Sequence, residues 1–191
     1  MPSHMPSWEE LENACAGCQA CGLGATRTNI VVGVGSRAAE VLFVGEGPGY
    51  HEDMQGEPFV GAAGQLLDKM LAAIRLDRQT AYIANVVKCR PPQNRDPQPE
   101  EIAQCLRFLR YQVMLIRPKI ICCLGRVSAQ TLISPAFRIT REHGQWTERK
   151  GIWLMATYHP SALLRDESKK REAWEDLKGL RRKLEELGMA R

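Results

Sequence analysis

Four short apolar runs recur along the chain, with longer segments of mixed hydrophobic and polar residues between them. The runs extend over Val41 to Val44, Tyr82 to Val87, Lys119 to Leu124 and Ile152 to Thr157. Apolar residues occupy successive rather than alternate positions in them, which is typical of strands buried on both faces of a sheet. Gly, Pro, Asn or His residues follow the runs, as expected where buried strands end in loops.

The segments between the runs show the spacing of amphipathic helices. The predicted helices extend over Ala63 to Arg75, Glu100 to Ile116, Val127 to Ile133 and Lys169 to Leu187. The second starts beside Pro99 and ends before Pro118, because proline suits the start of a helix but cannot continue one. Strands that alternate with helices predict βαβ units, and therefore a parallel sheet with right-handed crossovers.

Composition limits the number of domains and the class of protein. The chain has 191 residues, 44% of them hydrophobic and 25% charged, so we expect residues 1–191 to form a single domain. A net charge of +4 favours a polyanionic partner without requiring one. No stretch approaches the roughly 20 apolar residues of a membrane span, and Met1 to Met5 lacks the apolar core of a signal peptide. We therefore expect a cytoplasmic protein that does not enter a membrane.

Four of the seven cysteines form a candidate metal site. Cys18 and Cys21 are a pair with two residues between them, Cys89 lies just beyond the second predicted strand, and Cys105 lies in the following helix. In a reducing compartment such cysteines are better interpreted as ligands or buried thiols than as disulfides. Four thiolates suit either tetrahedral zinc or an iron–sulfur cluster, and spacing alone leaves unrelated free thiols as an alternative.

The other three cysteines have different expected places. Cys15 extends the first pair to CxxCxxC and is an alternative ligand. Cys122 and Cys123 lie within an apolar run, where adjacent side chains point to opposite faces of the sheet. Both are therefore expected in the core as small buried residues.

Polar side chains follow the apolar runs at three places. Glu46 comes two residues after the end of the first run, Asn85 lies near the end of the second, and His159 follows the fourth. Because open α/β sheets bind ligands beyond the carboxyl ends of their strands, these three side chains should converge on one crevice. A carboxylate, an amide and an imidazole in one crevice indicate an active site. The alternatives are a turn residue for Asn85 and a helix cap for His159.

Four motifs in order resemble a family 4 uracil-DNA glycosylase of the bacterial and archaeal kind. They are Gly45-Glu46-Gly47-Pro48-Gly49, Gly56 to Gly61, Tyr82 to Pro92, and His159 to Arg165, with the four cysteines at the family's places. The resemblance extends from about Cys18 to Leu177. It implies a three-layer αβα sandwich around a four-stranded parallel sheet, a structural [4Fe-4S] cluster, and hydrolytic removal of uracil from DNA. Residues 1–27 would then hold the N-terminal helix and the first cluster ligands, and residues 168–191 the C-terminal helix.

The resemblance also assigns roles to single residues. The implied cluster ligands are Cys18, Cys21, Cys89 and Cys105, with zinc as the alternative metal. Phe59 would stack on the flipped base, with a place in the core as its alternative, and Asn85 would recognise uracil with the loop of Gly45, Gly47 and Gly49. His159 would face the leaving oxygen. The expected DNA contacts are Arg90, Ser161, Leu163, Leu164 and Arg165, the two leucines acting as an apolar wedge.

The chemistry gives each polar residue a task. Asn85 can accept a hydrogen bond from uracil N3–H and donate one to O4, whereas cytosine presents the reverse pattern. Negative charge develops on uracil O2 during cleavage, and His159 is the candidate donor to it. Glu46 ranks first for orienting the attacking water, ahead of Glu52 and Asp53, because Gly47 stands where several other uracil glycosylases carry an acid or amide.

Some expectations remain open at this point. Lys88, Arg90 and Arg95 lie beside Cys89 and predict either a phosphate-contacting loop or a solvated one. The enzyme should leave an intact abasic site. The alternatives are a glycosylase that also takes hypoxanthine or xanthine, and a non-catalytic iron–sulfur protein that binds DNA damage. We expect a monomer, and recruitment by a sliding clamp is left open.

Overall fold

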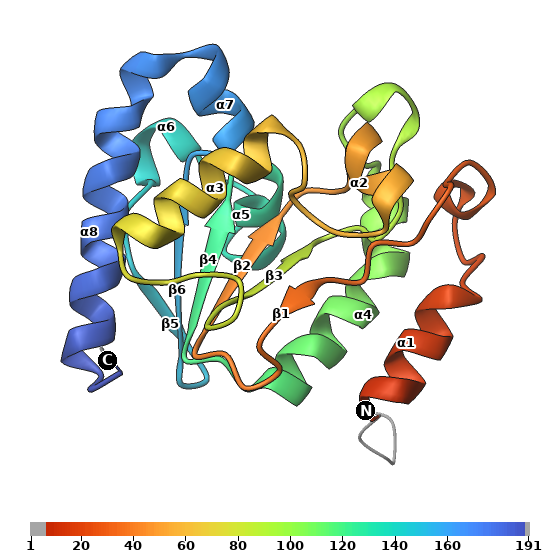
Figure 1. The fold of residues 1–191 in the computed structure, drawn as a ribbon, viewed down its shortest axis with the longest axis horizontal. Helices are drawn as coiled ribbons and strands as arrows, with labels where there is room; N and C mark the ends of the chain where they lie inside the picture. The colour runs from red at the N-terminus through yellow and green to blue at the C-terminus, as the bar shows by residue number, and fades with distance from the viewer. Residues whose placement is uncertain (1–6, 190–191) are drawn as a thin grey trace.

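Six strands form one sheet in the computed structural model (Figure 1), in the order β1-β3-β2-β4-β6-β5. Their bounds are β1 Val34–Gly35, β2 Val41–Gly45, β3 Tyr82–Asn85, β4 Ile120–Leu124, β5 Thr147–Arg149 and β6 Ile152–Thr157. The inner strands β3, β2, β4 and β6 are parallel, whereas β1 and β5 are antiparallel at the two edges. The predicted four parallel strands are therefore correct for the centre of the sheet, but the sheet as a whole is mixed and has six strands.

Helices cover both faces of the sheet. They are α1 Trp8–Ala16, α2 Tyr50–Gln55, α3 Ala62–Ala73, α4 Pro99–Ile116, α5 Arg126–Leu132, α6 Ile139–Glu142, α7 Pro160–Arg165 and α8 Lys170–Glu186, with short 3-10 turns at Gly22–Ala25, Pro92–Asn94 and Glu167–Lys169. Leu42 and Val44 of β2 pack with residues of α1 and α4, and the alternate residues Val41 and Phe43 pack with α3 and α8. This alternation confirms the three-layer αβα sandwich.

The structure describes residues 7–189. The segment Met1 to Met5, in which no signal peptide is expected, lies outside them, as do the outermost residues of the predicted domain. Within residues 7–189 no helix has the length and apolar character needed to cross a membrane. Cys122 and Cys123 are fully buried in β4, as predicted.

The four parallel strands end at the same edge of the sheet, at the top of Figure 1, where α2 and α7 also lie. From β2 the chain crosses to β3 on one side and later to β4 on the other side of β2. The strand order thus reverses around β2, and such a switch point opens a crevice beyond the strand ends.

Candidate active site

A cavity open to solvent, with a volume of about 500 Å³, lies at this switch point. The residues from strand ends that line it include Glu46, Asn85, Leu124 and His159, and the loop before α3 contributes Phe59. The structure therefore brings together the carboxylate, the amide, the imidazole and the aromatic ring. Other predicted residues that line the cavity are Gly47, Gly49, Ser161 and Arg165.

Asn85 ends β3 with its side chain buried at the floor of the cavity, only 2% exposed. Its Oδ1 is the one buried side-chain oxygen or nitrogen atom in the described part of the chain without a hydrogen-bond partner. An unpaired buried acceptor costs about 1–3 kcal/mol, so its presence in a cavity wall indicates a donor that arrives with a ligand.

Gly45 opens the space in front of this amide. A Cβ at Gly45 would overlap Asn85 Oδ1 and would lie 2.7 Å from the Phe59 ring. Any larger residue at this strand end would thus fill the space between the amide and the ring. This explains how Gly45 belongs to the site although its own atoms do not line the cavity.

Phe59 and His159 both line the cavity, and their rings contact each other. Their ring centroids are 5.5 Å apart, with 31° between the ring planes. Phe59 has a φ of 56°, a left-handed conformation that non-glycine residues rarely adopt, and Arg78 holds it by donating to its carbonyl oxygen. A strained residue held at a cavity wall is typical of a functional site.

His159 is the N-cap of α7, and its ring is fixed by that role. The Ser161 N–H donates to His159 Nδ1 over 3.1 Å, and the Ser161 hydroxyl lies 2.8 Å from the same atom. Because Nδ1 accepts, the ring proton belongs on Nε2, which is then a donor. Burial, followed by the charge of Arg165, lowers the pKa of His159 to about 4, so the ring is neutral at pH 7. The cap and the donor role are therefore compatible.

Three carboxylates near the cavity, Glu46, Glu52 and Asp53, differ in their hydrogen-bond partners and neighbouring charges. Glu52 accepts hydrogen bonds from the backbone of Gly49, Val60 and Gly61, and Asp53 accepts from the backbone of Thr28 and Asn29. These two residues hold loops. Glu46 instead faces Asp96, and burial followed by this neighbouring charge raises the pKa of Glu46 to about 7. Glu46 is thus the carboxylate best suited to exchange a proton near neutral pH.

The predicted DNA contacts divide into exposed and buried residues. Leu164 is 45% exposed at the end of α7, and Arg165 beside it is exposed too. Leu163 is only 2% exposed and packs in the core against the sheet, so it is not available as a wedge, whereas the wedge role of the exposed Leu164 stays a prediction. Arg90 is half-buried, bonds Asn94 and lies over the Tyr50 ring.

The loop beyond β3 also departs from the prediction. Lys88 is fully buried, so it cannot contact phosphate. Arg95 makes two hydrogen bonds to the Glu101 carboxylate, at 2.7 and 2.9 Å, and is thereby occupied within the chain. Among the described residues, Arg90 is the basic side chain of this loop that is neither fully buried nor paired with a carboxylate.

A second, smaller cavity lies beside α4 and contains the four predicted cysteines. Cys18, Cys21, Cys89 and Cys105 all line it, and Cys15 is buried outside its lining. Among residues 7–189 no group of three or more His, Cys, Asp or Glu side chains is arranged to hold a metal ion. All four cysteines nevertheless line one cavity.

Comparison with known proteins identifies the family. A sequence profile of the Uracil DNA glycosylase superfamily matches residues 32–178. A protein of Archaeoglobus fulgidus named Type-4 uracil-DNA glycosylase is 47% identical over 168 residues, which cover 84% of this chain and 84% of that protein. Proteins of the same name from Sulfurisphaera tokodaii and Thermotoga maritima are 43% and 45% identical, and the matches cover 93% and 79% of this chain and 84% and 80% of those proteins. The chain belongs to the uracil DNA glycosylase superfamily. The resemblance seen in the sequence is thereby confirmed.

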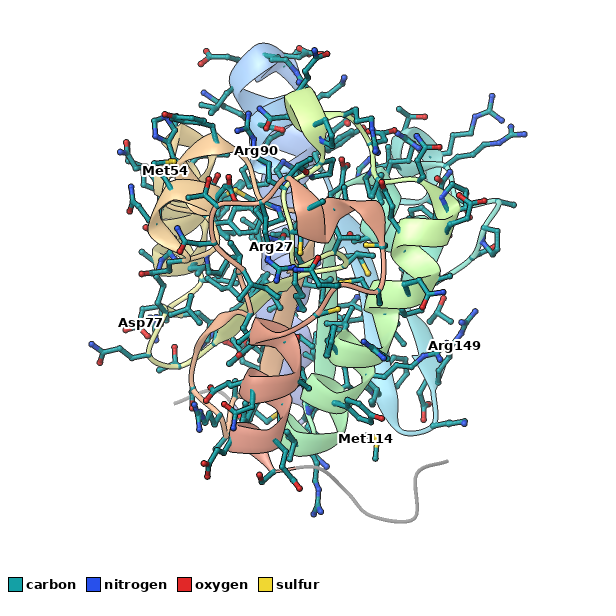
Figure 2. The ribbon with its side chains drawn as sticks, turned by 90° about the vertical axis from the view of Figure 1, so that its right-hand side faces the viewer. Arg27, Met54, Asp77, Arg90, Met114 and Arg149 are labelled. Carbon is teal, nitrogen blue, oxygen red and sulfur yellow. The ribbon has the colours of Figure 1, made fainter. Side chains whose placement is uncertain are left out.

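In this member of the superfamily, nitrogen donors reach three of the four cysteine sulfurs. The Lys88 backbone N–H donates to Cys105 over 3.2 Å, and Arg27 Nη1 donates to Cys89 over 3.2 Å. Arg107 Nη2 lies 3.6 Å from the Cys18 sulfur. Figure 2 shows Arg27 beside sulfur atoms of this region. Such donors stabilise thiolates, which is the form that binds metal.

Two residues that line the larger cavity were not predicted. Asp96 and Arg126 form an ion pair at the mouth of the larger cavity, and both line it near Glu46. Arg126 lies two residues after the end of β4, as His159 does after β6, and Glu46 lies one residue after β2, so the position of Arg126 was a usable signal. Asp96 lies in a proline-rich loop whose path the sequence pattern does not define.

Proposed function

We propose that this chain is a uracil-DNA glycosylase that flips uracil out of DNA and hydrolyses its glycosidic bond. The observation that carries the proposal is the buried Asn85 amide, whose unpartnered Oδ1 faces a cavity walled by Phe59 and His159. The relatives named Type-4 uracil-DNA glycosylase support the same substrate. Hypoxanthine and xanthine are purines, and no observation favours them over uracil.

Recognition would combine stacking with hydrogen bonds. The flipped base stacks on Phe59, a contact worth about 1–3 kcal/mol, while Asn85 Oδ1 accepts from uracil N3–H and Nδ2 donates to O4. Cytosine would bring an acceptor to Oδ1 and a donor to Nδ2, leaving buried groups unpaired. A site of this kind can reject the wrong base by about 10⁴- to 10⁵-fold. Leu164 is placed to fill the gap in the stack.

Cleavage would be chiefly electrostatic. The bond between N1 and C1′ breaks with its electron pair going to the base, so that negative charge develops on uracil O2. The neutral His159 donates from Nε2 to this oxygen, and one such preorganised donor is worth about 3 kcal/mol. The water oxygen bonds to C1′, its proton passes to the Glu46 carboxylate, and the uracil anion later takes a proton from solvent.

The absence of an amine nucleophile supports a monofunctional enzyme. No lysine is found among the described residues that line the cavity. A Schiff base on the sugar needs such a lysine, so the product should be an intact abasic site.

The smaller cavity fits an iron–sulfur cluster held by Cys18, Cys21, Cys89 and Cys105. Four cysteines are the ligand set of a [4Fe-4S] cluster, and here all four line one cavity with N–H donors beside two of them. A single zinc ion would need all four within about 2.3 Å of one point. When bound, the cluster would serve as a structural tie between residues 18–27, the loop beyond β3 and α4. Visible absorption that bleaches on reduction would separate it from zinc.

The test is excision of uracil from a single-uracil oligonucleotide, with abasic sites revealed by alkali. Wild type should release uracil, whereas Asn85→Asp and His159→Ala should be slower by about 100-fold or more in single turnover. The matched controls Asn13→Asp and His51→Ala change exposed residues of the same types and should keep the wild-type rate. Wild type without activity on uracil would refute the proposal.

Three outcomes of the same assay address the alternatives. Release of hypoxanthine or xanthine at the uracil rate would identify a broader enzyme, and tight binding without release would identify a damage-binding protein. A strand nick without alkali would contradict the monofunctional mechanism. Monomeric action, a sliding-clamp partner and a cytoplasmic location stay predictions from the sequence.

A further inference from the structure

Lys88 is a lysine that the mechanism does not use, and the structure buries it completely between the cysteine cavity and the end of β3. Its Nζ donates to the Asn85 backbone carbonyl over 2.9 Å and to Gln112 Oε1 over 2.6 Å. Gln112 is itself oriented, because its Nε2 donates to the Val32 carbonyl over 2.8 Å. The position of the amine is therefore fixed by two acceptors, of which Gln112 is itself held in place.

The backbone of Lys88 is bound at the cysteine cavity. Its N–H donates to the Cys105 sulfur over 3.2 Å, and its carbonyl accepts from Val31 N–H over 2.8 Å. The next residue, Cys89, lines the cysteine cavity. Lys88 thus donates one hydrogen bond from its main chain to the candidate ligand Cys105 and another from its side chain to Asn85.

Further backbone hydrogen bonds hold the five-residue segment from Asn85 to Cys89. Val86 N–H donates to the Gly45 carbonyl, and Val87 N–H donates to the Glu46 carbonyl, at 3.0 and 3.1 Å. Rotation of the peptide plane after Asn85 would tilt the Asn85 side chain, and the bond from Lys88 Nζ opposes that rotation. Fully burying a lysine is costly unless all its donors are used, so an aliphatic residue would suit a purely structural role better.

We propose that Lys88 is a positioning residue for uracil recognition, which couples the cysteine site to the Asn85 amide. The proposal rests on the proposed function, because it assumes that Asn85 reads the base. Ordering of the cysteine site fixes the Lys88 backbone, the Lys88 amine fixes the Asn85 carbonyl, and the amide is then held at the cavity floor. A change in the order of the cysteine site is therefore expected to change the position of the Asn85 amide, and a change at Asn85 is expected to change the cysteine site.

The main test compares Lys88→Met with Tyr82→Phe in the cluster-loaded protein. Lys88→Met keeps most of the side-chain length but removes its donors. Tyr82→Phe removes a buried hydroxyl that accepts from Gln112 Nε2, and it leaves both hydrogen bonds of the Lys88 amine in place. Lys88→Met should raise KM for uracil-containing DNA and reduce the preference for uracil over cytosine by about 10- to 100-fold, as expected for a misplaced contact. Tyr82→Phe should keep both within about threefold of wild type.

A second readout is independent of activity. The rate at which a chelator bleaches the visible absorption should rise in Lys88→Met and stay near wild type in Tyr82→Phe. If the two variants agree in KM, preference and bleaching rate, and differ from wild type only in melting temperature, Lys88 is merely structural and the proposal is wrong.

Wild type supplies the test if Lys88→Met does not fold. Amide hydrogen exchange is measured on peptides covering residues 82–89 while the chelator removes the metal. Faster exchange of Val86 and Val87 would support the coupling, and unchanged exchange would overturn it. Because this readout needs no substrate, it separates a failure of the coupling from a failure of the proposed function, which the excision assay on wild type decides.

Discussion

Glu46 is the residue whose ionisation we expect to set the pH dependence of excision. Burial and the charge of Asp96 raise its pKa to about 7, and only the carboxylate form can accept a proton from water. The single-turnover rate should therefore increase with pH, with a midpoint near 7, and level off about one to two pH units above it. Glu46→Gln should remove this step and lower the rate by about 100-fold or more. A near-normal rate in Glu46→Gln would exclude Glu46 as the water-positioning group.

The two neighbours of Glu46 offer controls of opposite sign. The Asp96 charge raises the pKa of Glu46 and the Arg126 charge lowers it. Asp96→Asn should therefore move the midpoint of the rate profile to lower pH, and Arg126→Gln should move it to higher pH. The raised pKa of Glu46 also affects the free energy of unfolding, because the unfolded chain releases this proton at lower pH than the folded chain. Stability contributed by this group thus decreases as pH rises from about 4.5 to about 7.

His159 should affect stability in the opposite direction. Its pKa is about 4 in the folded protein against 6.5 for an ordinary histidine, so between these values the unfolded state binds a proton that the folded state does not. The free energy of unfolding should fall as pH falls from 6.5 towards 4. Urea unfolding of wild type and His159→Gln at pH 4.5 and pH 7 checks this. If both proteins lose the same stability on acidification, the ring is not buried as a neutral group.

Sequence reasoning at the residue scale worked where position along a strand determines the side chain's place. Glu46, Asn85 and His159 each lie at or just after the end of an apolar run, and the structure brings all three to one cavity. It was wrong for Lys88, because a lysine in a polar loop is normally exposed and nothing local reveals the acceptors that bury it. Those acceptors come from α4 and from the turn itself, and only the tertiary fold brings them together.

At the scale of elements, α3 packs so closely against the loop of Phe59 that a side chain at Gly64 would not fit. A Cβ at Gly64, in the first turn of α3, would overlap the Phe59 carbonyl group. Gly64→Ala should therefore displace Phe59, weaken binding to abasic-site DNA and destabilise the protein by about 1–3 kcal/mol. Chemical unfolding and DNA-binding titrations measure the two effects.

The same substitution elsewhere in a helix should have the opposite effect on stability. A Cβ at Gly179 in α8 would lie 3.9 Å from Arg182 Nη2, its nearest neighbour outside the helix backbone. Gly179→Ala should thus stabilise the protein by up to about 1 kcal/mol through helix propensity and leave DNA binding unchanged. Equal effects of the two substitutions would show that α3 does not constrain the Phe59 loop.

The elements themselves were predictable in proportion to how much apolar surface they bury. The four inner strands and the helices α3, α4, α5 and α8 were found from their hydrophobic pattern, to within a few residues at their ends. The edge strands β1 and β5 have two and three residues, and Thr147–Arg149 is polar, so no apolar run marks them. The short helices α2 and α7 were read as motifs, because six residues are too few to show a helical period.

At the scale of the whole molecule, charge cannot explain DNA binding unless it is concentrated on one side. The net charge is only +4. Arg126 and Arg165 line the cavity at the carboxyl edge of the sheet. Figure 2 shows Arg90 near the top of the molecule, and Arg149 of the β5–β6 hairpin far below it. We therefore expect DNA phosphates to bind only around the cavity mouth.

Salt dependence of binding tests this placement of charge. Arg165 is exposed beside Leu164, so Arg165→Gln should remove about one phosphate contact and reduce the slope of log K against log salt by about 1. Lys150→Gln removes the same charge from the exposed turn between β5 and β6, at the opposite end of the strands, and should leave the slope unchanged. Fluorescence anisotropy with an abasic-site duplex at several salt concentrations gives both slopes. Equal slopes in the two variants would mean that the bound DNA does not pass over α7, and the wedge role of Leu164 would then fail as well.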